Sequence, residues 1–376
     1  MASVIGWILR CGVVLSAACI AIGLALAAYS PQCTSKAVIT VGLFLLIATP
    51  VIRVAASLIA FAVEGDAPFV LITAAVLAIL LFSIFFAGKL LPLTPHAPLG
   101  EVHYTWAYLC FIFAGSILAG FIGSLIGLGG GVLIVPLVTL VFGFPIYDAI
   151  GASIIAVIAT SSGAAAAYVK DRMVNMRVGM FLEIATTIGA VSGAFLVGYF
   201  SASLLSVIFG VILLISSLPM VFKFGEELPQ GVQNDALATR LCLDGSYPDH
   251  KTGQIVSYQV THTGFGLIMM YIAGLISGLL GIGSGTFKVL GLDVAMRLPM
   301  KVSTTTSNFM IGVTAAASAG IYYSRGDILP MLAAPIALGT LAGSTLGAYT
   351  LQHISNRAIR ILFFCIILIT AFEMIF

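Results

Sequence analysis

The chain has 376 residues, of which 60% are hydrophobic and only 8% charged, and its formal net charge is +2. Soluble domains carry about 25% charged residues, so this composition excludes a soluble globular protein and indicates a polytopic membrane protein. The nearly neutral charge argues against nucleic acid as a partner. The six cysteines show no CxxC or metal-ligand spacing, so we expect packing residues, with neither a metal nor a cofactor.

Runs of about 20 apolar residues predict membrane-spanning helices along the whole chain. The first run is interpreted as a retained helix rather than a signal peptide, because similar runs follow at once. The predicted spans are residues 11–28, 38–61, 69–89, 108–144 with an internal break, 148–169, 179–200, 204–222, 265–292 with a break, 302–323, 330–351 and 359–376. Two polar segments separate them, residues 91–104 and 223–262, and the longer is expected to be a linker rather than a folded domain.

The second half of the chain repeats the first. Residues 119–131 (AGFIGSLIGLGGG) match residues 273–285 (AGLISGLLGIGSG) at 7 of 13 positions, at an offset of 285 − 131 = 154. The same offset pairs three polar residues with identical ones, Ser153 with Ser307, Thr160 with Thr314 and Tyr168 with Tyr322. Further on, the glycines at 189 and 193 pair with those at 339 and 343, at an offset of 150. Two copies of one structural unit are therefore predicted.

Loop charges predict that the two copies are inverted. Lys170, Arg172 and Arg177 lie in the middle loop of the first copy. The second copy instead carries Arg297 with Lys301 and Arg357 with Arg360 in its outer loops, and its middle loop has only Arg325 beside Asp327. By the positive-inside rule, equivalent loops then lie on opposite sides of the membrane, with residues 223–262 in the cytoplasm and residues 91–104 outside. Inverted repeats with broken helices are typical of secondary transporters.

The two glycine-rich turns are predicted to break their helices and to face an anion. Residues 127–131 and 281–285 each precede a short apolar stretch that should restart a helix, whose free N–H groups and dipole favour anions. The candidate binding residues in these turns are Gly129, Gly130, Gly131, Gly283, Ser284 and Gly285. Gly120, Gly123, Gly274 and Gly278, at helical spacing, are interpreted as helix-packing positions.

Polar side chains of the next helix in each copy are further candidates. Ser153 and Thr160 lie seven residues apart on one helix face, as do Ser307 and Thr314. The run at residues 303–308 (STTTSN) adds Thr306, Ser307 and Asn308. These residues line a cavity at the interface of the repeats if both faces meet there, and otherwise cap and cross-link helices.

Three of the charged residues within predicted spans are considered as functional candidates or for their position. Lys288 follows the second glycine turn. Its amine is expected to face an anion; the alternatives are that it pairs with Asp293 or extends to the cytoplasmic surface. Its equivalent in the first copy is Ile134. Glu183 is a candidate proton-coupling carboxylate or a partner of Arg177, and Arg53 is expected toward the cytoplasmic end of its helix.

The duplicated glycine motifs, the GTFKV motif at 285–289 and the TTSNF run at 305–309 resemble the TauE/SafE sulfite exporter family over residues 104–376. The resemblance implies export of sulfite, sulfonates or other small sulfur or carboxylate anions by residues of both repeats. A proline usual after the second Lys-Val is Leu290 here, whereas Pro136 keeps it in the first copy. Residues 7–83, with WILRCGVVLSA and TPVIRVAASLIAF, resemble a three-helix membrane family of unknown function.

These observations predict an all-α polytopic membrane protein with four parts. They are an N-terminal three-helix domain (1–92), repeat 1 (93–223), a cytoplasmic linker (224–262) and repeat 2 (263–376). The expected function is secondary transport of a small sulfur-containing or organic anion across the cell membrane, by alternating access around a midplane site. A passive anion channel is the alternative, followed by a membrane scaffold or receptor. An enzyme is not expected, because the spans contain no nucleophile–base pair. The expected partners are the anion, membrane lipid and a second copy of the chain.

Overall fold

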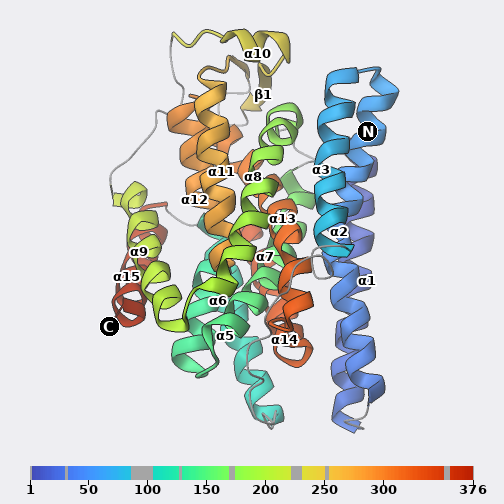
Figure 1. Ribbon diagram of the computed structural model, residues 1–376, viewed down its shortest axis with the longest axis vertical. Helices are drawn as coiled ribbons and strands as arrows, with labels where there is room; N and C mark the ends of the chain where they lie inside the picture. The colour runs from blue at the N-terminus through green and yellow to red at the C-terminus, as the bar shows by residue number, and fades with distance from the viewer. Residues whose placement is uncertain are drawn as a thin grey trace.

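The computed structural model describes residues 2–29, 33–85, 105–126, 129–168, 174–221, 231–249, 254–350 and 356–375, and it confirms an all-α membrane fold (Figure 1). Seven of the described helices are long and apolar enough to cross a membrane. The N-terminal domain comprises α1 (Ala2–Tyr29), α2 (Cys33–Glu64) and α3 (Ala67–Phe85). The predicted outer segment at residues 91–104 lies outside the described residues.

The two repeats have the same order of elements. Repeat 1 comprises α5 (Trp106–Ile126), α6 (Gly131–Pro136), the π-helix η1 (Leu137–Val141), α7 (Ile146–Tyr168), α8 (Met176–Leu196), the 3-10 turn η2 (Val197–Tyr199) and α9 (Ala202–Val221). Repeat 2 comprises α11 (Thr263–Leu280), α12 (Gly285–Leu290), the π-helix η3 (Gly291–Ala295), α13 (Met300–Arg325), α14 (Pro330–Thr350) and α15 (Asn356–Ile375). In Figure 1, α5 and α6 lie in the lower half of the molecule and α11 in the upper half, as inverted copies require.

Glycines allow helices of one repeat to pack closely against helices of the other. A Cβ added to Gly193 on α8 would lie 2.1 Å from the Leu275 carbonyl oxygen on α11, and one added to Gly343 on α14 would lie 2.1 Å from the Ile117 carbonyl oxygen on α5. Contacts this close need residues without side chains. The packing prediction for Gly120, Gly123, Gly274 and Gly278 agrees with this geometry, since a Cβ at each would come within 2.5 Å of neighbouring backbone.

The linker is more ordered than expected. It contains the short helix α10 (Ala236–Arg240) and an antiparallel hairpin of β1 (Gly245–Asp249) and β2 (Gln254–Tyr258). The Asp235 side chain caps α10 by accepting from Ala238 N at 2.7 Å, and it also accepts from Thr263 N at 2.7 Å at the start of α11. Local caps and strand pairing therefore give the described part of the linker a small ordered structure.

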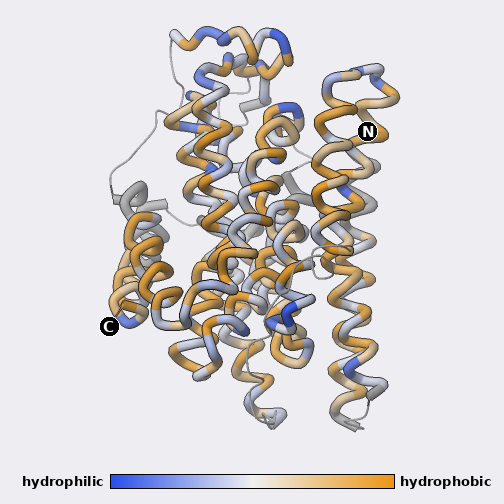
Figure 2. The backbone as a smooth tube through the Cα atoms, in the orientation of Figure 1, coloured by the Kyte–Doolittle hydropathy of each residue, from blue (hydrophilic) through white to orange (hydrophobic). Residues whose placement is uncertain are grey.

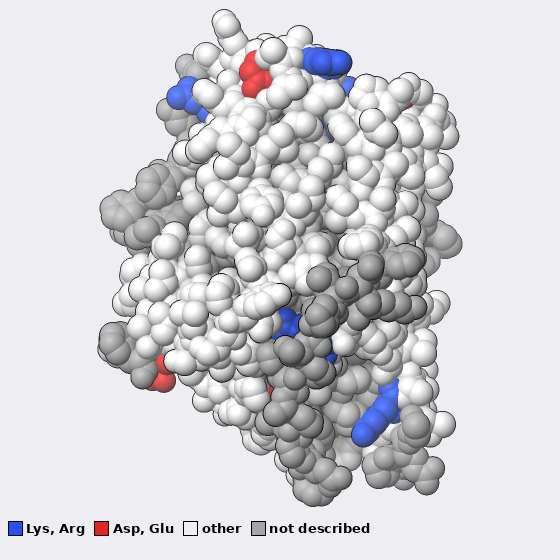
Figure 3. Space-filling view, viewed as in Figure 1, with Lys and Arg blue, Asp and Glu red and all other residues white. Residues whose placement is uncertain are grey.

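Polar and apolar surfaces are separated along the long axis. The hydropathy tube is mostly apolar through the bundle and polar over α10 and the hairpin (Figure 2). On the visible face, charged residues lie at this end and again toward the lower end, on either side of a broad uncharged band (Figure 3). The N-terminus lies in the upper part of the molecule, toward this end (Figure 1). Arg177 donates to the Cys242 carbonyl at 3.4 Å, and Lys301 Nζ lies 5.9 Å from the Tyr247 ring centre. Basic residues from loops of both repeats therefore meet the linker on one side, as the charge pattern predicted.

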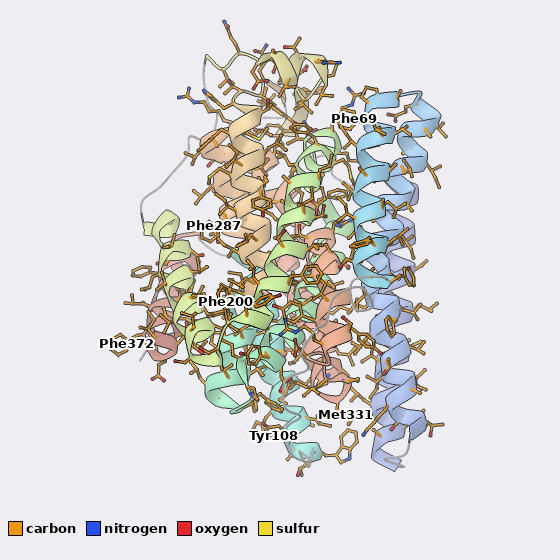
Figure 4. The ribbon with its side chains drawn as sticks, viewed as in Figure 1. Phe69, Tyr108, Phe200, Phe287, Met331 and Phe372 are labelled. Atoms are coloured by element: carbon orange, nitrogen blue, oxygen red, sulfur yellow. The ribbon has the colours of Figure 1, made fainter. Side chains whose placement is uncertain are left out.

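The N-terminal domain is packed against the repeats. Asp66 pairs with Arg177 at 2.8 Å, and the Arg177 guanidinium lies 5.5 Å from the ring of Phe69, at the upper end of α3 (Figure 4). On α3, the Ser83 hydroxyl donates to the Ala317 carbonyl of α13. On α2, Arg53 is buried against Phe309 of α13. Tertiary packing therefore buries Arg53 inside the protein, and the sequence alone did not predict this burial.

Candidate functional site

The two predicted breaks are present in both repeats. Between α5 and α6, Gly129 and Gly130 have φ values of 81° and 70°, and between α11 and α12, Gly281 and Gly283 have 67° and 72°. Positive φ is readily adopted only by glycine, which explains these residue types. Ser284 adopts a φ of 49° even though it is not a glycine. Gly127 and Leu128 lie outside the described residues.

The two turns converge at the interface of the repeats. A Cβ on Gly131 would lie 2.8 Å from the Gly281 carbonyl oxygen. A Cβ on Gly129 or on Gly283 would contact the same two side chains, Val157 and Ile311, at 3.0–3.7 Å. Val157 and Ile311 are themselves repeat equivalents, since 311 − 157 = 154. The two turns therefore lie close together, as predicted, and both contact Val157 and Ile311 near the pseudo-twofold axis that relates the repeats.

The serines confirm the repeat register in three dimensions. Ser153 Oγ donates to the Gly131 carbonyl at 3.1 Å, and Ser307 Oγ lies 3.3 Å from the Gly285 carbonyl, so each serine holds the equivalent turn of its own repeat. Ser153 Oγ also lies 2.8 Å from the Gly281 carbonyl of the other repeat. The Ser153 hydroxyl thus gives a partner to the Gly281 carbonyl, which lies just beyond the C-terminal end of α11, where carbonyls lack intrahelical partners.

The equivalent threonines differ. Thr160 Oγ1 lies 2.8 Å from the Gly129 carbonyl and stays within its own repeat. Thr314 Oγ1 instead accepts from Lys288 Nζ and lies 2.9 Å from Glu183 Oε1. The hydroxyl of Thr314 therefore joins the buried amine to the buried carboxylate.

Lys288 and Glu183 form the charged centre of the protein. Lys288 is 0% exposed and Glu183 is 1% exposed. Phe287, next to Lys288, lies near mid-height of the molecule (Figure 4). Among the described residues, Glu183 Oε2 has no hydrogen-bond partner. The pairing of Glu183 with Arg177 is excluded, because Arg177 pairs with Asp66. An unsatisfied buried carboxylate oxygen is costly and marks a group that could take a proton or meet a ligand.

A small pocket lies against α13, where its lining residue Ile311 is one helical turn from Thr314. It is lined by Gly123, Ser124, Gly129, Thr160, Ser161, Asn308 and Ile311, and its volume is about 10 Å³. Gly129, Thr160 and Asn308 were predicted, whereas Ser124 and Ser161 were missed, although Ser161 directly follows Thr160. Such a volume holds about one water molecule, so an anion enters only if the surrounding elements move.

Two other predicted residues, Thr306 and Ser284, differ in whether they have a partner. Thr306 Oγ1 accepts from the backbone N–H of Asn175 at 3.2 Å, at the linker end of the molecule. Within the described part of the chain, the buried Ser284 hydroxyl has no partner, and it lies in the turn just before Lys288. The described residues contain no cluster of ligands suited to a metal ion.

The broken inverted repeats, the long apolar helices and the buried ionic centre define a multi-pass membrane transporter. The model of the sulfite exporter TauE/SafE family matches residues 112–374, and the chain belongs to this family. Residues 29–85 match the model of a protein family of unknown function, DUF1634.

Curated relatives are also described as transporters. The chain is 27% identical over 269 residues to the "Probable membrane transporter protein YunE" of Bacillus subtilis, covering 69% of this chain and 94% of that protein. It is 26% identical to YdhB of the same organism, covering 61% of this chain and 85% of that protein. A methanogen protein, MJ0441 of Methanocaldococcus jannaschii, is 24% identical, covering 65% and 87%. No solved structure matches the chain significantly.

Proposed function

We propose that the chain is a secondary transporter that exports small sulfur-containing or organic anions, such as sulfite, sulfonates or thiosulfate, across the cell membrane. The observation that carries the proposal is the amine of Lys288, fully buried beside a glycine turn and held by Thr314 within reach of Glu183. Charges inside a membrane protein are costly and are typically retained for function.

The two glycine turns and the polar pocket would form the rest of the site. Gly129, Gly130 and Gly131 face Gly283, Ser284 and Gly285 across the axis, with Ser153, Thr160, Ser307 and Asn308 around them. The Ser284 hydroxyl, which has no partner among the described residues, and the polar wall of the pocket would supply donors for an oxyanion. In a dry interior such donors bind an anion more strongly than they would in water.

The small volume of the pocket supports a carrier rather than an open channel. With about 10 Å³ available, the site admits an anion only after Val157 and Ile311 separate or the turns shift. Alternating access by movement of one repeat against the other would supply that change. Glu183, with one oxygen held by Thr314 and the other without a described partner, is the group we propose to couple transport to a proton.

The test is direct. Purified protein would first be screened by thermal shift against sulfite, thiosulfate, sulfonates and small carboxylates, and each hit would be followed by uptake into proteoliposomes. Saturable flux that responds to a proton gradient supports the carrier. Flux that does not saturate and ignores the gradient identifies a channel. No binding and no flux for any of these anions would overturn the proposal.

A further inference from the structure

Arg53 is an arginine of the N-terminal domain buried inside the transporter. It lies on α2 and is 1% exposed. Its Nη2 donates to the Phe309 carbonyl on α13, and its guanidinium carbon lies 4.2 Å from the centre of the Phe309 ring. Its Nε, among the described residues, has no hydrogen-bond partner. These contacts satisfy part of the guanidinium and leave its positive charge without a directly bonded carboxylate.

The guanidinium reaches the wall of the pocket. A Cβ added to Gly312 would lie 2.6 Å from Ser161 Oγ and 3.5 Å from Arg53 Nη2, so Gly312 is the small residue that lets both groups approach α13. Ser161 lines the pocket and donates to the Asn308 carbonyl at 2.9 Å. Arg53 therefore stands directly behind the polar wall that Ser161 and Asn308 form.

Arg53 also belongs to the same electrostatic centre as the two charges described above. Glu183 is within Coulombic range of both Lys288 and Arg53, and Arg53 and Lys288 repel each other. Among the described residues, this centre thus holds two cations and one carboxylate, a net charge of +1 with Glu183 ionised and +2 with Glu183 protonated. A low-dielectric interior does not tolerate uncompensated charge, so a bound anion would supply the missing negative charge.

We propose that the N-terminal domain supplies Arg53 as the second cation of the transport site and thereby makes the site select doubly charged oxyanions over singly charged ones. This inference rests on the proposed function. With Glu183 protonated, the two cations balance a dianion, and one proton travels with it. Without Arg53, the remaining pair of Lys288 and Glu183 balances only a monoanion and a proton. Arg53 acts through the field in the pocket and is a positioning residue.

The experiment measures charge selectivity in proteoliposomes containing the full chain. Thiosulfate and methanesulfonate are suitable probes, since both are sulfur oxyanions and their charges stay at −2 and −1 over the working pH range. The wild-type protein is expected to prefer thiosulfate. Arg53→Gln should lower the ratio of thiosulfate to methanesulfonate flux at least tenfold, whereas Arg53→Lys, which keeps the charge, should retain most of the preference.

A matched control separates charge from domain docking. Ser83→Ala also removes a side-chain bond from the N-terminal domain to an α13 carbonyl, but it removes no charge, so its flux ratio should stay at the wild-type value. If Arg53→Gln lowers both fluxes in equal proportion, Arg53 only holds the domains together and the inference fails. A wild-type preference for methanesulfonate also overturns it. If the wild type carries neither probe nor any other small anion, the proposed function itself fails.

A double variant tests the same inference if Arg53→Gln alone folds poorly. Arg53→Gln combined with Glu183→Gln removes one charge of each sign and leaves the net charge at +1. Its remaining cation, Lys288, balances a monoanion, so this variant should prefer methanesulfonate. A preference for thiosulfate in the double variant contradicts the inference.

Discussion

The two repeats share one scaffold and differ in their chemistry. Both have a helix broken by glycine, a serine that holds the turn, and a cross-repeat helix pair packed through glycine. Only one copy of each equivalent pair carries the charge: Lys288 corresponds to Ile134, and Glu183 corresponds to Ala333 at the offset of 333 − 183 = 150. The duplicated sequence thus accounts for the helix bundle and its pseudo-twofold axis. The charged centre instead depends on the few positions, such as 288 and 183, at which the two copies differ.

The largest expected effect is the loss of Lys288. Lys288→Ala leaves Glu183 buried without its cation, and truncating a buried, hydrogen-bonded charge of this kind costs about 3 kcal/mol, which is about 100-fold. Flux in proteoliposomes should fall by about that factor. The matched variant Ile134→Ala, at the equivalent position of repeat 1, should keep most of its flux. Wild-type flux in Lys288→Ala would remove this residue from the site.

Stability changes, in contrast, should be symmetric between the repeats. Gly193→Ala and Gly343→Ala each place a methyl group 2.1 Å from a carbonyl oxygen of the partner helix. Overpacking of this kind costs about 1–3 kcal/mol, so both variants should lower the melting temperature by similar amounts. Thermal unfolding in detergent measures this. A large shift for one variant and none for the other would contradict the equivalence of the two helix pairs.

Substitutions of the equivalent threonines Thr160 and Thr314 test whether the two repeats contribute differently to transport. Thr314→Val removes the hydroxyl between Lys288 and Glu183, and hydrogen bonds to charged groups contribute about 1.5–3 kcal/mol, so flux should fall at least about tenfold. Thr160→Val removes a neutral bond to the Gly129 carbonyl, worth about 1 kcal/mol, and should reduce flux less. Equal losses of flux per folded molecule would show that both repeats contribute alike.

The smallest effect concerns the linker, which belongs to neither repeat. Burial alone would raise the pKa of Asp235, but hydrogen bonds from Ala238 and Thr263 outweigh it and lower that pKa below its ordinary value of 3.8. The carboxylate therefore adds stability above its unfolded pKa, and this stability is lost as the pH falls through the lower folded value. Asp235→Ala should loosen the linker by about 1 kcal/mol at neutral pH.

Limited proteolysis of the linker measures this effect. The wild type should become easier to cleave only below about pH 4, by the same titration, whereas Asp235→Ala should be cleaved faster already at pH 7. Asp235→Asn, which keeps a side-chain acceptor for the cap, serves as the control and should lie between the two. An unchanged cleavage rate in Asp235→Ala at pH 7 would show that the cap does not hold the linker.

Much of the architecture could be predicted from the chain alone. Apolar runs about as long as a bilayer is thick predict helices whatever their packing, and glycines at an offset of 154 predict both the duplication and the breaks. The charge of each loop predicted the side on which Arg177 and Lys301 meet the linker. Such features depend on local composition and on the membrane, so they can be recognised without knowing which helices touch.

Only the tertiary structure decided which of the polar residues meet. Thr160 and Thr314 are identical in type and position, yet one hydroxyl satisfies a backbone carbonyl and the other joins Lys288 to Glu183. Arg53, far from the repeats along the chain, reaches the pocket wall because α2 packs against α13 where Gly312 leaves room. The partners of a buried charge depend on helix crossings between distant segments, and no local pattern encodes those.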